Sequence, residues 1–443
     1  MATECYSQLG FGFQPKLVVD FSGGTLTTDA GLVLLREFDE HLRLSADVVG
    51  RVGDPRDARY VTHDVATLLR QRLYQIVAGY EDVNDADRLR HDPAFQAVAG
   101  DGREPLGSQP TLSRLENAIE WPEIQRLARV GIDWFCAYAY RPDEHPADLV
   151  LDLDSTDDPT HGAQQLALFH GWYDQHMYHP LLWFEGRTGV LLRTRLRPGR
   201  DPSAACVVED LQHLLPPLRR RFPHTPIFLR GDAGMATPRV EAKLEAEGIR
   251  YVLGIGTNRV FKARVAALVA KAQARYDRTG RPVSIRTSFR HRAKSWPHVR
   301  RILVKIDVTA QGLNVRFMVT NRRGRAADLV AWYDDRGASE NWIKELKLDI
   351  HADRLSCHRF RANAFRLQLH SIALLLLAYF RRSVLAGTRL ATATIGTIRL
   401  QLLKVAGRVR RTVRHLWFHL ASHWPGQPLF TACHRALARR APV

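Results

Sequence analysis

The chain has few cysteines, no long apolar run and no pattern typical of a cleaved leader. Its five cysteines, among 443 residues, form no Cys-x2-Cys pair, so neither a disulfide framework nor a thiolate zinc site is indicated. They are Cys5, Cys136, Cys206, Cys357 and Cys433. The longest apolar run, Ile372 to Phe380, is far shorter than the roughly 20 residues that a membrane span requires. We therefore expect a soluble protein of a reducing cytoplasm with no membrane partner.

Acidic residues are missing from two stretches of the chain. Residues 281–305 contain eight Arg or Lys residues and no acid, and residues 381–443 contain 12 basic residues and no acid. The formal net charge of the whole chain is +18. Clustered cations gain affinity for phosphates by releasing condensed counterions, so nucleic acid is the expected partner. Arg far outnumbers Lys, which suits two-pronged phosphate contacts but is equally explained by a GC-rich coding bias.

The spacing of apolar residues divides the chain into segments of different character. Residues 1–145 are expected to be mainly helical. Short apolar runs separated by turn residues in 146–255 predict strand, hairpin, helix, strand, helix and strand, which is a mixed α/β core. Further β-like runs in 256–325 predict a β-rich segment, and helices are expected to return in 326–382 and in the basic tail 383–443.

Two aspartates end the apolar run Leu149–Asp154. Alternate residues of a strand share a face, so Asp152 and Asp154 point to one side of an otherwise apolar strand. Burying both carboxylates would be costly unless a cation neutralises them. Either aspartate could instead cap a following helix at Ser155. We prefer Asp154 as a metal ligand because sites in such sheets open at strand ends, and we assign Asp152 a supporting structural role.

Asp232 occupies a similar position after a second apolar run. It follows Ile227–Leu229 and lies in the turn Gly231-Asp232-Ala233-Gly234, whose glycines permit close approach of a ligand or metal. An ordinary Asp-Gly turn is the alternative for this residue taken alone.

A third acid lies in a stretch with helical spacing. Tyr333, Arg336, Glu340 and Lys347 stand at offsets near multiples of 3.5, so they stack along one helical stripe. A solvated helix with surface ion pairs would give the same pattern. Brought together with the two strand-end aspartates, Glu340 would complete an all-oxygen site for two hard divalent cations, as in enzymes that cut phosphodiester bonds.

Three motifs of the chain together resemble those of a known family. They are Asp154-Ser155-Thr156, Gly231-Asp232-Ala233-Gly234 and Tyr333-x2-Arg336-x3-Glu340-x6-Lys347. This set resembles the DDE transposases of bacterial insertion sequences that carry the YREK signature. The stretches Leu106–Arg114 and Asp154–Gly162 more narrowly resemble the insertion-sequence family numbered thirteen-eighty. The likeness runs from about Phe21 to Arg382.

The resemblance implies a fold and a metal site. The fold would be a ribonuclease-H-like mixed-sheet core, with the β-rich segment 256–325 as an insertion. Asp154, Asp232 and Glu340 would bind two Mg2+ ions, with Mn2+ as a substitute. One ion activates water or a freed 3′-hydroxyl, and the other stabilises the leaving oxygen.

The resemblance also implies the contacts with DNA. Tyr333, Arg336 and Lys347 would hold the phosphates near the cut. Related enzymes stack an aromatic residue of the insertion on a flipped base, and Trp296 is the candidate here, although a role in the core is an equal alternative.

The expected activity is cutting and joining of the ends of the protein's own insertion sequence. The partners would be double-stranded terminal inverted repeats and target DNA, bound by residues 1–145 with help from the basic patches of the insertion and tail. A homodimer on paired DNA ends is expected by analogy, in the cytoplasm at the bacterial nucleoid.

Two other functions fit parts of the sequence. Asp152-x-Asp154-x-Thr156 matches the motif of haloacid-dehalogenase-like phosphatases, in which the first Asp is phosphorylated, but the second acid that this fold needs after Gly231-Asp232 is missing. A non-catalytic DNA-binding protein would explain the charge but would leave the three carboxylates without a purpose.

Overall fold

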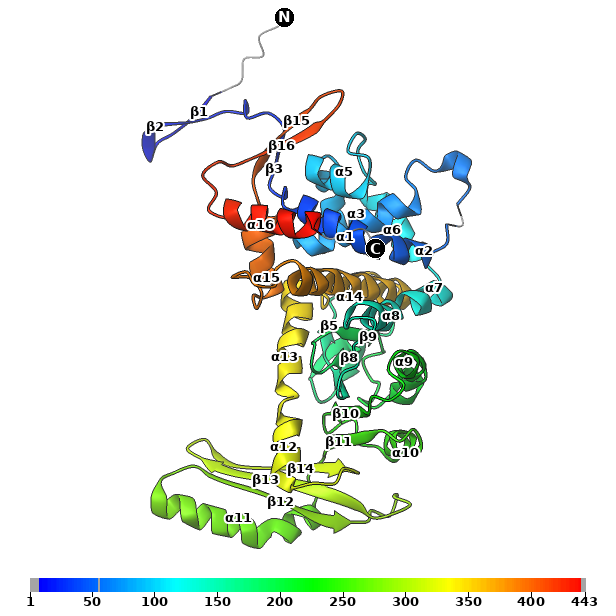
Figure 1. Ribbon diagram of the computed structural model, residues 1–443, viewed down its shortest axis with the longest axis vertical. Coiled ribbons are helices and arrows are strands. Elements are labelled where there is room, and N and C mark those ends of the chain that lie inside the picture. Colours follow the sequence, from blue (N-terminus) through cyan, green and yellow to red (C-terminus); the bar gives the residue numbers. More distant parts are fainter. Residues whose placement is uncertain (1–7, 55, 440–443) are drawn as a thin grey trace, which may run out of the picture. The chain divides into compact units, whose positions relative to one another are not determined.

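The computed structural model describes residues 8–54 and 56–439 and divides the chain into two compact units (Figure 1). The helical unit comprises Met1–Ile119, Asp349–His351 and Ile372–Val443, and the sheet unit comprises Glu120–Leu348 and Ala352–Ser371. Cys136, Cys206 and Cys433 are free thiols, and Cys5 lies outside the described residues.

Short helices make up most of the first part of the helical unit. Its elements up to residue 119 are β1 (Leu9–Phe11), β2 (Gln14–Val19), β3 (Leu26–Thr27), α1 (Leu32–Leu42), α2 (Leu44–Gly50), η1 (Ala58–Tyr60), α3 (Val65–Ala78), η2 (Val83–Asp85), α4 (Ala86–Leu89), α5 (Pro93–Ala99) and α6 (Gln109–Ala118). Helix α3 begins where the Asp64 side chain accepts a hydrogen bond from Thr67 N and ends at Gly79 in the left-handed region. Its apolar side chains are almost all buried, so α3 forms the centre of this part.

The basic tail contains a β-hairpin between its helices. Its elements are α15 (Ile395–Ile398), η4 (Arg399–Leu403), β15 (Gly407–Arg411), β16 (Leu416–Leu420) and α16 (Gln427–Ala438). The prediction of a helical tail is therefore wrong between 407 and 420. Basic or aromatic residues alternate there with apolar ones, which is the two-residue period of a strand with one covered face.

One large mixed sheet organises the sheet unit. Its elements are α7 (Trp121–Leu127), α8 (Val130–Tyr138), β4 (Leu149–Ser155), β5 (Asp158–Pro159), β6 (Leu168–His170), β7 (Gln175–Tyr178), β8 (Leu181–Glu185), β9 (Leu191–Arg195), α9 (Val207–Arg221), β10 (Ile227–Gly231), α10 (Pro238–Ala246), β11 (Arg250–Ile255), α11 (Arg259–Thr279), β12 (Val283–His291), β13 (Arg300–Thr309), β14 (Gly312–Thr320), α12 (Ala326–Asp334), α13 (Gly337–Lys344) and η3 (Glu345–Asp349). The eight-stranded sheet has the order β12-β13-β14-β11-β10-β4-β8-β9. Strands β4, β10 and β11 are parallel, and β8 and β9 continue from β4 as an antiparallel meander.

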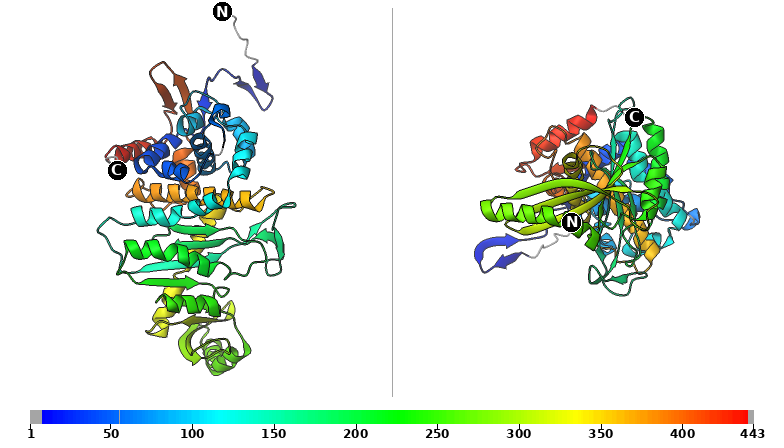
Figure 2. Two further views of the ribbon diagram at one scale, coloured as in Figure 1. Left: turned by 90° about the vertical axis from the view of Figure 1, so that its right-hand side faces the viewer. Right: turned by 90° about the horizontal axis from the view of Figure 1, so that it is seen from below.

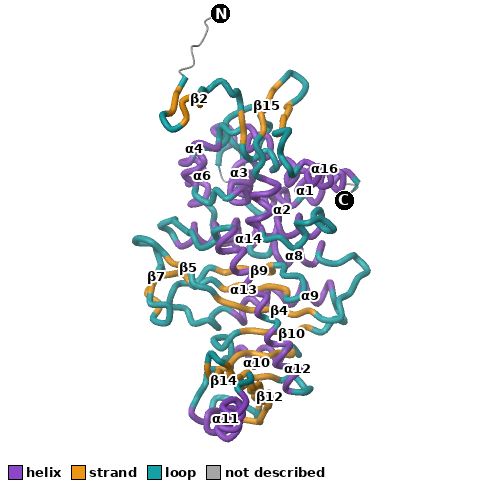
Figure 3. The backbone as a smooth tube through the Cα atoms, turned by 90° about the vertical axis from the view of Figure 1, so that its left-hand side faces the viewer, coloured by secondary structure: helices purple, strands orange, loops and turns teal. Residues whose placement is uncertain are grey.

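Helices cover both faces of this sheet. Helices α9 and α10 cross over between the parallel strands and lie on one face, whereas α12 and α13 run across the other (Figures 1, 2 and 3). The side chains of β8 show both contacts, because the Trp183 indole donates to Asp210 of α9 and the neighbouring Phe184 ring packs against Trp342 of α13. Asp152 and Asp154 pair across the strands with Phe184 and Leu182 and so share the face of α12 and α13.

The segment 256–325 extends the main sheet. Strands β12, β13 and β14 coincide with the three β-like runs of the sequence, and β14 pairs with β11 of the core. The long helix α11 was not predicted, although Asn258 caps its first turn and Gly280 ends it in the left-handed region. Alanine is frequent in this helix and only Phe261, Val265 and Ala272 are buried, so its apolar positions form no clear stripe.

Helix α14 (Phe360–Ser383) is the longest helix among the described residues, with 24 residues. Residues 360–371 belong to the sheet unit and 372–383 to the helical unit. Within the described ranges, none of the helices has both the length and the apolar character that a membrane span needs.

Candidate active site

The sheet brings Asp154 and Asp232 together at the carboxyl ends of two neighbouring parallel strands. Strands β4 and β10 are parallel neighbours in which Leu153 lies opposite Gly231, so the two aspartates follow at equivalent positions. Both belong to the face crossed by α12 and α13. The predicted pairing of two strand-end carboxylates is therefore present in the structure.

A guanidinium group holds the carboxylate of Asp154. Arg336 Nη1 lies 2.6 Å from Asp154 Oδ2, with only 18% of the arginine and 13% of the aspartate side chain exposed. Burial, with a contribution from the charge of Asp232, raises the pKa of Asp154 to about 6 despite the opposing effect of Arg336. The site thus lacks solvent stabilisation for its negative charge, which makes a cation beside Asp154 favourable.

The Asp232 turn is packed closely against its surroundings. Gly234 N donates to Asp232 Oδ1 over 3.0 Å, and the Tyr333 hydroxyl donates to the carbonyl of Gly231 over 3.2 Å. A Cβ atom on Gly254 would lie 2.7 Å from the backbone nitrogen of Ala233 and 3.0 Å from the Tyr333 hydroxyl. Only glycine at position 254 therefore permits this approach of β11 to the turn.

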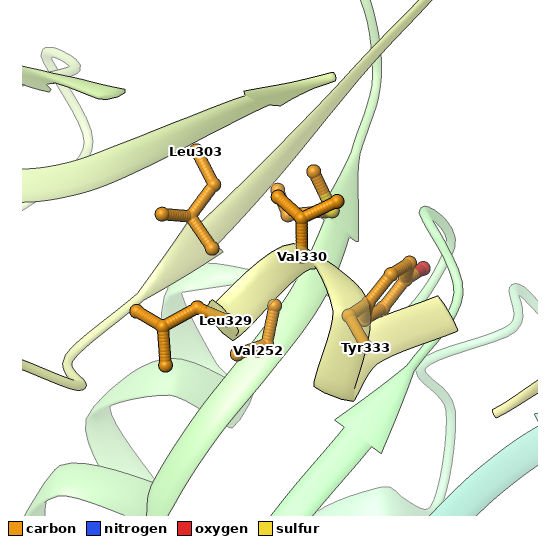
Figure 4. Close-up of a cluster of buried hydrophobic side chains, with 6 residues drawn as sticks. Val252, Leu303, Leu329, Val330 and Tyr333 are labelled. Carbon is orange, nitrogen blue, oxygen red and sulfur yellow. The ribbon is translucent and has the colours of Figure 1, made fainter. Parts of the chain in front are cut away.

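Tyr333 is anchored in a hydrophobic cluster beneath this turn (Figure 4). The cluster joins α12 to three strands and consists of Val252, Leu303, Met318, Leu329, Val330 and Tyr333. Tyr333 is 9% exposed. Its ring therefore fixes α12 against the sheet while its hydroxyl reaches the strand end that carries Asp232.

Glu340 lies on the exposed surface of α13. It follows Arg336 by four residues, which places it about one helical turn further along the same face. Among the residues that the structure describes, no group of three or more His, Cys, Asp or Glu side chains is arranged to hold a metal ion. The structure thus brings two of the three predicted ligands to one edge, and convergence of Glu340 on them stays a prediction.

Lys347 binds the loop that follows Asp154. Its ammonium group donates to a carboxylate oxygen of Asp157 over 2.9 Å and to the Asp157 carbonyl over 2.8 Å. Burial alone would raise the pKa of Asp157, but Lys347 and other hydrogen bonds lower it overall. Lys347 lies in η3, a wide π-type turn, and such turns inside helices are frequent at functional sites.

Asp152 has a different environment from Asp154. Its two oxygens each accept a hydrogen bond of 2.6 Å from Arg230, and the pair is 1% and 3% exposed. Arg230 also donates to the carbonyl of Trp332 in α12. Asp152 therefore has the supporting role expected of it, and both oxygens that a phosphatase nucleophile would need are engaged.

Trp296 is buried in the insertion. It is 5% exposed, its ring contacts His291, and the Arg300 guanidinium lies 5.1 Å from the ring centre. Of the two roles left open by the sequence, this environment matches the core residue.

Sequence reasoning missed two participants in the network. Arg230 stands directly opposite Asp152 in the paired strands, and its position inside an apolar run was the available signal. Asp157, the partner of Lys347, is one of several polar residues after Asp154, and nothing in its spacing distinguished it.

The donor set suits a hard divalent cation. The predicted ligands Asp154, Asp232 and Glu340 all carry carboxylate oxygens, and burial leaves the charge of Asp154 with little solvent stabilisation. These groups fit Mg2+ or Mn2+ better than a soft metal, because no cysteine belongs to the set.

Comparison with known proteins identifies the family. Among curated proteins, the comparison finds no match to this chain. A family model described as transposase DDE domain group 1 matches residues 9–442, which is nearly the whole chain. The chain therefore belongs to the DDE transposases, which are metal-dependent enzymes that cleave DNA.

Proposed function

We propose that this transposase cuts and joins the ends of its own insertion sequence, and that Asp154, Asp232 and Glu340 are its catalytic carboxylates. The observation that carries the proposal is the pair of aspartates at equivalent ends of β4 and β10, beneath the helices that bear the signature residues. Arg336 links one of these helices to Asp154 directly.

The three carboxylates would hold two Mg2+ ions, for which Mn2+ substitutes. Bound divalent ions supply an activated water or 3′-hydroxyl and stabilise the leaving oxygen. The register of β4 and β10, which brings Asp154 and Asp232 to equivalent strand ends, supports this role. Glu340 would join them from α13, one turn beyond Arg336.

The signature residues would position DNA at the cut. Arg336 and Lys347 carry positive charge beside Asp154 and Asp157, where a scissile phosphate would also need neutralisation. Tyr333 supports the Asp232 turn through its hydrogen bond to Gly231. We assign these residues to the YREK signature of the family numbered thirteen-eighty.

The arrangement of strands supports a ribonuclease-H-like core. An antiparallel meander of β4, β8 and β9 is followed by the parallel strands β10 and β11, with crossover helices between. The segment 256–325 enters between the second and third carboxylates, as an insertion in such a core would.

Double-stranded DNA is the proposed partner, as terminal inverted repeats and as target. A homodimer would assemble on paired ends, because each active site must act on one end of the element. The net charge of +18 favours association with the nucleoid.

A cleavage assay tests the proposal. The full chain is incubated with a labelled duplex that spans the element boundary, with Mg2+, with Mn2+ or with EDTA. We expect cleavage at the boundary with either ion and none with EDTA. Retained binding without cleavage under any divalent ion would instead support the non-catalytic DNA-binding protein.

A further inference from the structure

The hairpin β15–β16 presents two faces of different chemistry. In the paired strands Arg408 lies opposite His419 and Arg410 lies opposite Trp417, so these four side chains share one face, and all four are exposed. The opposite face carries Val409 together with the partly buried apolar residues of β16. One face is thus covered by the protein and the other is cationic and aromatic.

The base of the hairpin is firmly attached to the helical unit. Strand β3 pairs with β15 through Gly407 and Arg408, and Val409 N donates to the carbonyl of Thr25 over 2.8 Å. Thr27 of β3 in turn donates to Asp92, which caps α5. The exposed face is therefore held by the fold and is not a loose segment.

The aromatic residues of the exposed face are ordered against one another. The rings of Trp417 and His419 are parallel within 5°, with centres 6.0 Å apart, and His415 packs edge-on against Trp417. Trp417 nevertheless remains 50% exposed. A large aromatic residue held in place and left half in water is typical of a contact surface.

The tip of the hairpin continues the positive charge. Val413 at the tip is fully exposed, and a hollow of about 710 Å³ is lined by residues that include Arg410, Arg414 and Trp417. Arg411 lies opposite Leu416 on the covered side, near Asp101. The hydrogen bond from Arg103 N is the main cause of the lowered pKa of Asp101, and the charge of Arg411 lowers it further. From residue 384 to the end the sequence contains no acid at all.

We infer that the exposed face and tip of β15–β16 form a duplex-DNA-binding ribbon, with Arg408 and Arg410 on phosphates and Trp417 in the groove. A two-stranded ribbon fits the major groove of B-DNA, and its strands lie about 4.8 Å apart in a groove about 12 Å wide. Charge complementarity selects a polyanion, and membership of a DNA-cleaving family selects DNA. The inference rests on the proposed function and assigns a binding surface to it.

Binding without metal tests the ribbon separately from catalysis. The probe is a fluorescein-labelled duplex that carries the element end, titrated with the full chain in EDTA and followed by anisotropy. The double variant Arg408→Gln/Arg410→Gln should bind about 30-fold more weakly at roughly 0.15 M salt, and the slope of log affinity against log salt should fall by about 2. Trp417→Ala should bind the duplex more weakly, and this loss of affinity should persist when salt is raised, because salt does not screen an apolar contact.

A matched control is available in the same unit. Arg435 and Arg439 are exposed on or beside α16, and Arg435→Gln/Arg439→Gln removes the same charge without touching the hairpin. Equal losses in the two double variants, or no loss in the hairpin variant, would overturn the ribbon. A single-stranded competitor that displaces the duplex at equal concentration would overturn the choice of duplex.

A cross-link gives a second readout that does not depend on affinity. A photoreactive residue in place of Val413 should cross-link to the duplex, and one in place of Leu400, which is also exposed, should not. Absence of the Val413 cross-link from a bound complex would contradict the ribbon. Failure of the unaltered chain to bind any duplex would contradict the proposed function itself.

Discussion

The ends of β4 and β10 in the sheet unit and the β15–β16 ribbon of the helical unit are both rich in charge. They differ in whether the charged groups are paired. At these strand ends, Asp154 is paired with Arg336 and Asp152 with Arg230, and these groups are largely buried. On the ribbon, no ion pair of Arg408 or Arg410 with a carboxylate occurs in the part of the chain that the structure describes. Buried pairs hold a geometry, whereas exposed cations remain available to a polyanion.

Removal of the carboxylates should have the largest effect and should separate cleavage from DNA binding. Asp154→Asn, Asp232→Asn and Glu340→Gln should each reduce cleavage by about 10³-fold, roughly 4 kcal/mol, because each removes a metal ligand. Metal-free binding to the duplex should be unchanged, since the ribbon keeps its charge. The double variant Asp154→Asn/Glu340→Gln should be no worse than either single variant. Cleavage by Glu340→Gln at the normal rate would contradict the assignment of that residue.

The buried pair Asp152–Arg230 should control stability rather than DNA binding. Arg230→Met leaves a carboxylate without a partner in the core and should destabilise the sheet unit by about 3–5 kcal/mol. Asp152→Leu in the same chain should restore most of the loss, as measured by thermal unfolding. Arg408→Gln/Arg410→Gln is the contrasting variant and should leave the unfolding temperature unchanged. Asp152→Asn should weaken cleavage without abolishing it, whereas a phosphatase that uses Asp152 would be inactive.

Arg336 should compete with metal for Asp154 when DNA is absent. In Arg336→Gln the Asp154 carboxylate loses its 2.6 Å partner, so Mn2+ binding to the free protein should tighten by about tenfold. Cleavage should nevertheless fall, because the guanidinium that would hold a phosphate is gone. Lys347→Gln is the matched control, since Lys347 contacts Asp157 instead. Equal Mn2+ affinity in Arg336→Gln and the unaltered chain, by titration calorimetry, would count against this competition.

The smallest effect is expected from Tyr333→Phe. The variant keeps the ring in its cluster and removes one hydrogen bond, to the carbonyl of Gly231. Stability should fall by about 1 kcal/mol and cleavage by less than tenfold. A loss of cleavage as large as that of Asp232→Asn would mean that the hydroxyl does more than support the turn.

Much of the sheet unit could be predicted because its strands have simple patterns. The alternation in β4 gave the face of Asp152 and Asp154, and the apolar run before Asp232 gave the neighbouring strand. Helical spacing placed Arg336 and Lys347 on one stripe. It could not show that Arg336 would bind Asp154 itself, or that a turn at residues 335–336 and the wide turn η3 would interrupt the helix.

The remaining differences between the prediction and the structure have local causes. The strands β15 and β16 are short and β15 is rich in arginine, so composition suggested a basic helix although the alternation was that of a ribbon. Helix α11 has few buried residues, so no apolar stripe marked it in the sequence. The burial of Trp296 depends on the fold of the insertion and on Arg300, which no spacing rule relates to it.

The central claim is that carboxylate oxygens of Asp154, Asp232 and Glu340 share metal ions when DNA is bound. The most direct measurement is the anomalous scattering of Mn2+ in crystals of the chain bound to its element end. We expect Mn2+ peaks about 2.1 Å from oxygens of all three residues. Peaks that contact the two aspartates but not Glu340 would contradict this claim.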